Sequence, residues 1–534
     1  MRRGDERFLQ GTHRAHAVHS TVFTVVDDFH RAMFASVVLS ATLVWPPPRH
    51  ITTSGVPLPV GAIDIQPSRT SARLTRTIDR FAPLTLVEGS QLTLRINITG
   101  PASDDDAAVT SSTCHHYTLL VRASDAVVTS CSVHGAAYAL ETLTQLLSHG
   151  NGALPNIDVD DAPQYAWRGL MLDTGRRFIP VPLVENMLDT MAAVKLNVLH
   201  LHASDFCRFA VESKVFPNLT AALTGDMAGH YSQDDVRGLI AYAADRGIRI
   251  VPEFDVPGHA RGMLPIEGSV HFCTDKASRS QLYDDPAGET YAAVHSLVQE
   301  MASLFTDEVL HLGCDETKAT GPCSTNSTFG FERRLVDAVS AEFGKTPSGW
   351  EEIYFDAGAA TPSTIVNAWT RHTAAEVTAT GRRAVESHSA YWYFTAAAPG
   401  GPAGWAKCWH DAGENVPAAQ RHLVLGGEMS MWTDTYTAPR QCGAFGPGAA
   451  EPGAALFPPA RDAAFGKSLG GMIWPRGFVG AAAFWNYNAS VDPSADGFVD
   501  AIWKTNDALR ARGSLTCPSK CDCDQVSACG TPYV

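Results

Sequence analysis

The alternation of apolar and polar residues changes its period near residue 160. Before that point, short segments such as Leu92–Ile96 and Tyr117–Val121 alternate with a period of two, which is typical of half-buried strands. They are followed by Gly135–Leu147, whose apolar residues could form one face of a helix. This pattern predicts a small α+β domain.

From Trp167 onward, apolar strand-like segments alternate with longer helical stretches. We expect strands at Arg168–Asp173, Asn197–His202, Ile248–Phe254, Val309–Gly313, Pro347–Glu351, Thr364–Trp369, Ala384–Ser389 and Gly427–Trp432. Strands that alternate with helices in this way predict a (β/α)8 TIM barrel. The fold class is therefore α/β, with the barrel preceded by the small α+β domain.

The two ends of the chain differ from this body. The apolar segment Ala32–Trp45 has the length of a signal-peptide core and is short for a bilayer span. It lies far from residue 1, so translation from Met33 and a signal anchor are both compatible with it. We expect an N-terminal extension at 1–50, the small domain at 51–160, the barrel at 161–505 and a Cys-rich tail at 506–534.

Composition narrows the class of protein. A chain of 534 residues with a net charge of −15 lacks the basic surface that a general nucleic-acid binder needs. It contains no Walker A or GxGxxG motif, so we expect no nucleotide cofactor. Twelve cysteines point to the secretory pathway, lysosome-like or extracellular. Four glycosylation sequons support this interpretation: Asn97, Asn218, Asn326 and Asn488.

The candidate chemistry begins at Asp315 and Glu316, which directly follow the fourth predicted barrel strand. The carboxyl ends of barrel strands carry the active sites of this fold. Two crowded carboxylates shift each other's pKa, so one can hold a proton while the other stays charged. This suits cleavage of a glycosidic bond. Taken alone, the pair could equally be a surface feature or a helix N-cap.

Other polar and aromatic residues gather at the ends of the remaining strands. They are Arg176, Asp205, His259, Trp350, Trp369, Tyr393 and Trp432. Charged groups can bond sugar hydroxyls, and aromatic faces can stack on pyranose rings. Any one of these residues could be an ordinary core or surface residue, but their coincidence on one rim indicates a sugar site.

These motifs resemble those of the glycoside hydrolase family 20 β-N-acetylhexosaminidases. The resemblance runs from about residue 115 to 490, and it includes Trp167–Arg176, Val251–His259, the His-X-Gly-X-Asp-Glu motif at 311–316 and Gly426–Asp434. It implies a retaining exo-β-N-acetylhexosaminidase that removes terminal β-linked GlcNAc or GalNAc without a metal or cofactor. In this reaction the substrate's own acetamido group is the nucleophile, which is an exception to the scheme with two catalytic carboxylates.

The resemblance also implies individual roles. Glu316 would be the general acid/base, Asp315 would orient the acetamido group and Tyr393 would bond its oxygen. Asp205 and His259 would tune the Glu316 proton. The other implied roles are an acetamide pocket walled by Trp350, Trp369 and Trp432, sugar hydroxyls held by Arg176 and Asp434, and a disulfide between Cys273 and Cys323. Cys114 and Cys131 could brace the small domain.

The sequence departs from the family pattern at Cys314, Leu201, Phe206 and Thr395, and Phe484-Trp485 ends the barrel without the usual Glu-Arg before it. These departures leave the substrate preference undetermined. Two other classes of protein also fit part of the sequence. A metal-dependent hydrolase could use His200, His202, His259 and Asp315 as ligands. A glycan-binding protein that has lost catalysis could share the fold. A homodimer is compatible with the sequence, and a membrane contact is expected only through a signal anchor.

Overall fold

The computed structural model describes residues 44–81, 86–224, 228–274, 280–317, 323–394, 401–434 and 462–517. Contacts divide the chain into two units, Met1–Leu39 and Ser40–Val534, and all described residues belong to the second. Most of the expected leader, Thr395 and most of the Cys-rich tail therefore lie outside the described residues.

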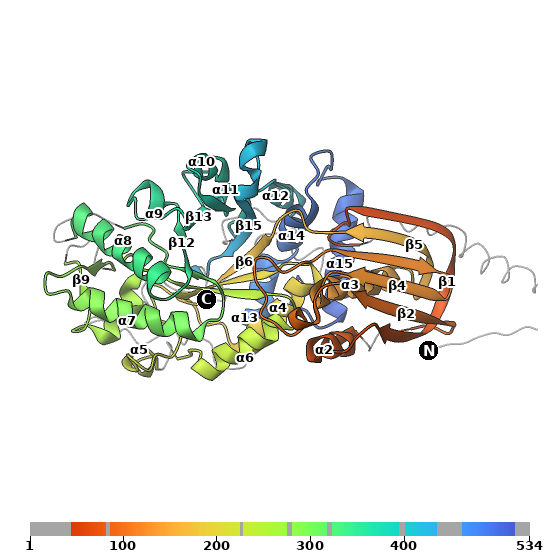
Figure 1. The fold of residues 1–534 in the computed structure, drawn as a ribbon, viewed down its shortest axis with the longest axis horizontal. Coiled ribbons are helices and arrows are strands. Elements are labelled where there is room, and N and C mark those ends of the chain that lie inside the picture. The colour runs from red at the N-terminus through yellow and green to blue at the C-terminus, as the bar shows by residue number, and fades with distance from the viewer. Residues whose placement is uncertain are drawn as a thin grey trace, which may run out of the picture. The chain divides into compact units, whose positions relative to one another are not determined.

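The small domain is a five-stranded sheet with one long helix against it (Figure 1). Its elements are β1 (His50–Pro67), α2 (Ala72–Phe81), β2 (Ser90–Ile98), η2 (Ala102–Asp104), β3 (Tyr117–Arg122), β4 (Asp125–Ser130), α3 (Val133–His149) and β5 (Ala153–Asp161). The strand order is β1-β2-β4-β3-β5, and the long β1 pairs with both β2 and β5. The predicted alternation is confirmed in β2, where Leu92, Leu94 and Ile96 are buried.

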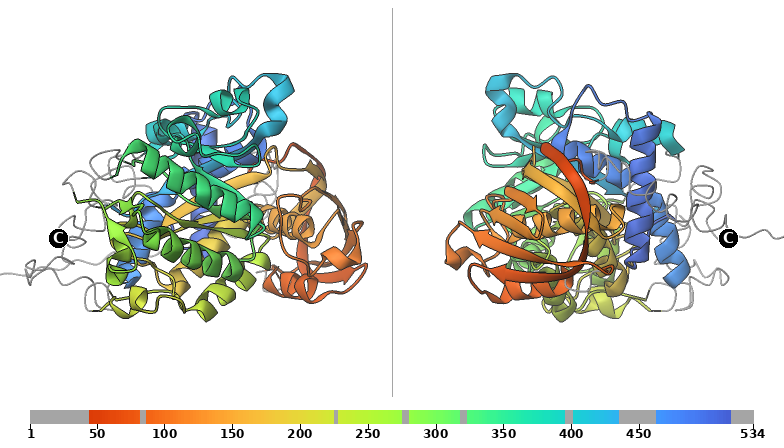
Figure 2. Two further views of the ribbon diagram at one scale, coloured as in Figure 1. Left: turned by 60° about the vertical axis from the view of Figure 1, so that its left-hand side comes forward. Right: turned by 90° about the vertical axis from the view of Figure 1, so that its right-hand side faces the viewer.

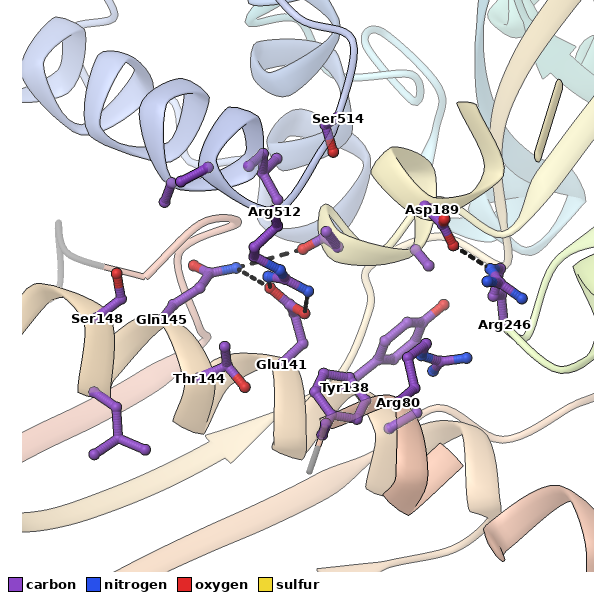
Figure 3. Close-up of a pocket in the computed structure, with 18 residues that line it drawn as sticks. Arg80, Tyr138, Glu141, Thr144, Gln145, Ser148, Asp189, Arg246, Arg512 and Ser514 are labelled. Atoms are coloured by element: carbon purple, nitrogen blue, oxygen red, sulfur yellow. Dashed lines mark hydrogen bonds and ion pairs between the residues drawn. The ribbon is translucent and has the colours of Figure 1, made fainter. Parts of the chain in front are cut away.

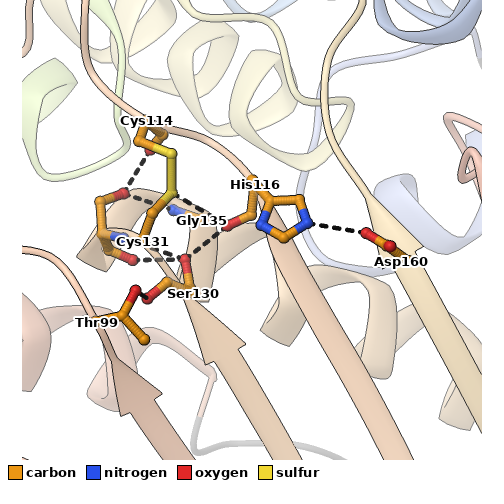
Figure 4. The surroundings of a disulfide bond; sticks show 8 residues. Thr99, Cys114, His116, Ser130, Cys131, Gly135 and Asp160 are labelled. Atoms are coloured by element: carbon orange, nitrogen blue, oxygen red, sulfur yellow. Dashed lines mark hydrogen bonds and ion pairs between the residues drawn. A yellow bond between two sulfur atoms is a disulfide. The ribbon is translucent and has the colours of Figure 1, made fainter.

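A local network fixes the start of α3. The Ser132 hydroxyl caps the helix by accepting from the Gly135 N–H at 3.1 Å. A disulfide joins Cys114 to Cys131 beside this cap, the pairing considered from the sequence (Figure 4). Ser132 also donates to the Cys114 carbonyl at 2.6 Å. The same hydroxyl therefore ties the start of α3 to the disulfide-bonded segment before β3.

The second domain is a closed barrel of eight parallel strands, so the predicted TIM barrel is confirmed (Figure 2). The strands are β6 (Trp167–Asp173), β7 (Val198–Ser204), β8 (Arg249–Phe254), β11 (Val309–His311), β12 (Thr346–Trp350), β13 (Ile365–Ala368), β14 (Arg383–Glu386) and β15 (Val424–Met431). Each overlaps one of the eight segments expected from the sequence. Pairing of His311 with Glu253 joins β11 to β8 and closes the ring.

Helices and short elements connect these strands, and three of the described helices follow the last strand. They are α4 (Val181–Ala193), α5 (Asn218–Ala221), α6 (Gln233–Ala244), η4 (Ala260–Ile266), β9 (His271–Phe272), β10 (Leu282–Tyr283), α7 (Glu289–Leu304), α8 (Thr325–Ala341), α9 (Glu352–Phe355), α10 (Ala374–Ala379), α11 (Ser389–Trp392), α12 (Gly401–Cys408), η5 (Ala418–Leu423), α13 (Asp462–Ile473), α14 (Arg476–Asn486) and α15 (Asp496–Ala511). None of the described helices is long and apolar enough to cross a membrane.

The barrel interior is layered from apolar to polar to aromatic. Its lowest layer includes Trp167, Val198 and Val251, which pack together near the starts of their strands. Successive strand residues point to opposite sides, so Glu253 lies on the same side as Val251 but higher in the barrel. Met171, Trp350 and Trp432 cluster above this level. The interior therefore becomes polar and aromatic toward the carboxyl ends of the strands, where chemistry is expected.

A buried ionic group joins the small domain to the barrel. We call Lys195, Asp161 and Tyr117 the junction cluster. The Lys195 ammonium lies 2.9 Å from both the Asp161 carboxylate and the Tyr117 oxygen, and its side chain is fully buried. The other Asp161 oxygen accepts from the Trp485 indole N–H at 2.8 Å. Burial alone would raise the pKa of Asp161, but the Lys195 ammonium holds it below its usual value.

Helix α3 also contacts both ends of the folded body. The Gln145 amide bonds the main chain of Trp45 in both directions, at 2.7 and 2.9 Å. One turn earlier, Glu141 accepts two bonds from Arg512, at 2.6 and 2.8 Å. Val44 and Trp45 are buried, so the last two residues of the apolar segment predicted as a leader belong to the folded body.

Candidate active site

A left-handed backbone turn presents Asp315 and Glu316 at the end of β11. Gly313, Cys314 and Glu316 have φ values of +70°, +69° and +49°, a conformation that costs L-residues about 1–3 kcal/mol each. At Gly313 a Cβ atom would lie only 1.9 Å from an Asp255 oxygen, so glycine is required there. Cys314, one of the departures noted in the sequence, has its side chain buried in the main apolar core of the protein.

His259 lies between Asp205 on one side and the pair Asp315 and Glu316 on the other. Its Nε2 is 3.3 Å from Glu316 and 3.7 Å from Asp315, and its Nδ1 is 3.5 Å from Asp205. Burial alone would lower the pKa of His259, but the surrounding carboxylates raise it well above its usual value. The ring can therefore carry a proton beside Glu316, whose own side chain is 52% exposed. A carboxyl group reachable from solvent and bonded to an imidazolium is suited to proton transfer.

Asp255 and Asp315 form a buried carboxyl pair. A side-chain hydrogen bond joins them, and burial followed by repulsion from Asp315 raises the pKa of Asp255 well above its usual value. Burial also raises the pKa of Asp315. The Oδ1 atoms of both residues make no hydrogen bond within the described part of the chain. Asp255 therefore holds the shared proton and leaves an oxygen of Asp315 as an available acceptor.

Arg176 forms ion pairs with three carboxylates of the rim. It lies 3.0 Å from Asp173, 3.0 Å from Asp205 and 3.2 Å from Asp434. Asp434 is 59% exposed, whereas Asp173 is fully buried. The guanidinium also lies over the Trp432 ring, 5.0 Å from its centroid. The Arg176 guanidinium thus holds together a row of carboxylates that runs from the buried Asp173 to the solvent-exposed Asp434.

Four aromatic rings form a box beside Asp315. Trp350 lies 5.9 Å from Trp432 and 6.4 Å from Trp369, and Tyr393 stacks on Trp369 at 5.9 Å. Tyr393 lies 5.9 Å from Trp432, which closes the box. Burial, with the Asp315 charge adding to it, raises the pKa of Tyr393 well above its usual value, so its hydroxyl remains a donor. The ten catalytic and substrate-binding residues named from the sequence thus gather on one rim.

Several residues of this rim were given no role from the sequence. Glu253 accepts from the Trp350 indole N–H at 2.8 Å and also contacts His202, which bonds Asp205 on its other nitrogen at 2.7 Å. Burial disfavours the charged His202, but Glu253 and Asp205 raise its pKa well above its usual value. Glu253 lies near the end of β8 and Asp255 directly follows this strand, and this spacing was the available signal. Ligand atoms of Asp255, His259 and Asp315 lie within 4.8 Å of one another, and those of His202, Asp205 and Asp255 do as well, which is the spacing that the metal-dependent alternative requires.

Glu351 and Glu352 fix the wall of the aromatic box. The buried Glu351 carboxylate accepts four backbone N–H groups, those of residues Trp369 to His372, at 2.8 to 3.2 Å. Glu352 accepts from the Trp369 indole N–H at 3.0 Å. Burial, with repulsion from Asp315, raises the pKa of Glu352 to about 7.

The structure shows where two other departures from the family pattern, Leu201 and Phe206, lie. Leu201 alternates with His200 and His202 on β7 and is buried in the core outside the strands, away from the rim. Phe206 follows the rim residue Asp205, and its backbone N–H donates to that carboxylate. A disulfide joins Cys273 to Cys323, the pair implied by the resemblance. Thr395 lies outside the described residues.

Comparison with known proteins identifies the family. The model of the glycosyl hydrolase family 20 catalytic domain matches residues 165–444. The chain is 31% identical to the Mus musculus beta-hexosaminidase subunit beta over 373 residues, 64% of this chain and 69% of the relative. The chain therefore belongs to glycosyl hydrolase family 20, and it is a glycoside hydrolase.

Solved structures share the fold. Flavobacterium johnsoniae chitobiase superposes with a TM-score of 0.70 at 23% identity and covers 88% of this chain and 73% of its own. Streptomyces plicatus N-acetyl-beta-hexosaminidase gives a TM-score of 0.69 at 23% identity, with coverage of 90% and 97%. Both match across the small domain and the barrel together, so the two-domain architecture is common to them.

Proposed function

We propose that this glycoside hydrolase is a retaining exo-β-N-acetylhexosaminidase that removes terminal β-linked GlcNAc or GalNAc by substrate-assisted catalysis. The observation that carries the proposal is the aromatic box beside Asp315, next to a solvent-reachable Glu316. We infer that these rings form the walls against which the planar amide of the substrate binds. The names of the relatives, beta-hexosaminidases, support the same substrate class.

In the first step Glu316 donates its proton to the glycosidic oxygen as the bond from that oxygen to the anomeric carbon breaks. The acetamido oxygen of the substrate attacks the anomeric carbon and forms an oxazolinium ring. Asp315 accepts the acetamido N–H through its available oxygen, and Tyr393 donates to the acetamido oxygen. Holding the amide against the anomeric carbon supplies proximity that is worth about 7–11 kcal/mol in favourable cases.

In the second step water attacks the anomeric carbon from the side of the departed group. Glu316 takes the water proton, the oxazolinium ring opens, and the β configuration is regenerated. His259, held by Asp205, positions Glu316 and supplies a nearby positive charge in both steps. Arg176 and Asp434 hold hydroxyls of the terminal sugar at the rim and so favour attack on the chain end.

The test uses substrates that differ only in the 2-acylamino group. Replacing acetamido by trifluoroacetamido withdraws electrons from the carbonyl oxygen, so kcat should fall steeply with each added fluorine. NMR of the first product formed should detect the β anomer. Equal rates for the fluorinated series, or an α first product, would overturn the substrate-assisted mechanism. In Asp315→Asn, turnover should fall for acetamido substrates, because the neutral amide oxygen accepts the N–H hydrogen bond more weakly than a carboxylate and carries no charge to stabilise the oxazolinium ring.

We also propose that the protein passes through the secretory pathway and carries N-linked glycans. Two described disulfides and the exposed side chains of Asn97, Asn218 and Asn488 support this proposal. The Asn326 side chain lies outside the described residues. A mass shift after deglycosylation of the protein secreted by a eukaryotic host would test it.

A further inference from the structure

A cavity of about 580 Å³ lies where the small domain meets the barrel (Figure 3). Helices α2 and α3 supply one wall, while α4, the end of α6 and the end of α15 supply the other. Its residues Ala193 and Arg246 precede β7 and β8, so it lies toward the amino ends of the barrel strands. The rim with Asp315 and Glu316 is at the opposite ends. A cavity of about 300–1,000 Å³ is the size that binds small molecules.

Three arginines line this cavity, and they are not equally compensated. Arg512 forms two bonds with Glu141, and Arg246 is paired with Asp189 (Figure 3). Within the described residues, by contrast, no carboxylate lies in ion-pair range of Arg80. Its one described hydrogen bond goes to the main-chain oxygen of Asp245, at 3.0 Å.

The surroundings of Arg80 disfavour its charge on balance. Burial, followed by repulsion from Arg246, lowers the pKa of Arg80, and the nearby carboxylates of Glu141, Asp189 and Asp245 offset this only in part. Two guanidinium groups that face one small volume would both be stabilised by an anion between them. The five charged side chains of the lining, three arginines with Glu141 and Asp189, leave one positive charge over. A bound monoanion would balance it.

The remaining lining suits a hydroxylated ligand. Ser148 and Ser514 lie at the cavity, and neither hydroxyl has a described hydrogen bond. Apolar atoms of Phe81, Leu147 and Leu509 complete the wall. This combination of unused hydroxyls, apolar surface and an unpaired cation differs from a purely ionic site.

From these features we propose a second, non-catalytic site that binds a small anionic sugar, of pyranose size and bearing a phosphate, sulfate or carboxylate group. Arg80 and Arg246 would bind the oxyanion, and the serines would bond the hydroxyls. A ligand there would contact both domains at once and would hold α3 against α15. This inference goes beyond the proposed function and does not depend on it.

Isothermal titration of the full chain with glucose 6-phosphate tests the proposal, with inorganic phosphate and glucose as the partial ligands. Glucose 6-phosphate should bind at least tenfold more tightly than either. Affinity should fall at least tenfold in Arg80→Gln and in Ser148→Asp, which places a negative charge at an exposed edge of the cavity. The matched control is Arg95→Gln, an exposed arginine of β2 paired with Asp125, which should bind like the parent.

Competition separates the two sites. Binding should persist unchanged when the rim is saturated with GlcNAc, and turnover in Arg80→Gln should match the parent. Displacement of glucose 6-phosphate by GlcNAc would place it at the rim and overturn the proposal. Equal affinity for inorganic phosphate, or unchanged affinity in both Arg80→Gln and Ser148→Asp, would overturn it as well.

Discussion

The junction cluster and the rim site are both buried and charged, yet they satisfy their polar atoms to different degrees. Both oxygens of Asp161 have hydrogen-bond donors, and Lys195 is fully buried. On the rim, Asp255 and Asp315 each keep one oxygen without a hydrogen bond among the described residues. A buried polar atom without a partner costs about 1–3 kcal/mol, so a fold retains it only where something compensates. For these two regions, the difference is the one we expect between a structural ionic cluster and a site that a ligand completes.

The largest expected effect is on the rim and appears only in catalysis. Glu316→Gln removes the proton donor, so kcat for a glycoside with a poor leaving group should fall about 100- to 10,000-fold. The loss should be smaller for a nitrophenyl glycoside, because that leaving group needs less protonation. The midpoint of thermal unfolding should stay near the parent's, since Glu316 is half exposed. Glu342→Gln, an exposed glutamate near the end of α8, is the matched control. Near-parent turnover of the poor substrate would contradict the role of Glu316.

The second effect is on the junction and appears only in stability. Lys195→Met leaves the Asp161 carboxylate buried without its cation, which should lower the free energy of unfolding by about 3–5 kcal/mol. Urea unfolding of the variant measures this change, and kcat of the folded enzyme should be unaffected. Lys214→Met changes an exposed lysine that is paired with Glu212, and it should cost less than about 1 kcal/mol. Equal losses of unfolding free energy in the two variants would show that the buried junction cluster stabilises the fold no more than an exposed ion pair does.

The third effect concerns pH and distinguishes raised from lowered carboxyl pKa values. Burial raises the pKa of Glu352 from 4.5 to about 7, so the folded protein holds a proton that the unfolded chain releases. This contribution to stability is complete below about pH 4.5 and is lost as the pH rises through about 7. Asp161, whose pKa is lowered, adds no slope in that window.

Glu352→Gln should therefore reduce the change in the free energy of unfolding across this pH window by up to about 3 kcal/mol. The lowered pKa values of His115 and His134 act in the opposite direction, but they are common to parent and variant. Thermal unfolding of both proteins from about pH 5 to 8 measures the difference. Parallel profiles would show that Glu352 is ionised in the folded protein throughout.

The smallest effect should come from Cys314→Gly. Glycine relieves the left-handed conformation at φ +69°, but it removes a buried side chain and makes the unfolded chain more flexible. These opposing changes should leave the free energy of unfolding within about 1 kcal/mol of the parent. Turnover should also be near the parent value, because the thiol points into the core. A large loss of turnover would indicate that the side chain holds Asp315 in place.

The sequence predicted most of the rim because most of its residues lie at the carboxyl end of a strand or shortly after it. Strand periodicity placed Asp205, His259 and Asp315 at carboxyl ends, and parallel strands bring those ends together. It could not predict that Asp255 holds a proton, because that depends on its approach to Asp315 in the folded chain. Glu253 was missed for a similar reason, since its partners come from other strands.

The junction could not be predicted from local patterns. Lys195 and Asp161 are 34 residues apart, and Glu141 and Arg512 are 371 apart. In both pairs, the sequence around one residue gives no indication of its partner. Buried lysines are rare, so composition alone would place Lys195 at the surface. Pairings of this kind become visible only when two domains are packed together.

Glu351 has a consequence for how this protein could diverge. Its carboxylate fixes four consecutive backbone N–H groups after β13, and Thr373 then caps α10 through a capping box. An insertion from Trp369 to Thr373 would move some of these donors away from the buried Glu351 carboxylate, so we expect this loop to tolerate a change of length poorly. New substrate specificities on this scaffold are therefore expected to arise by lengthening other loops of the rim, with the segment after β13 unchanged.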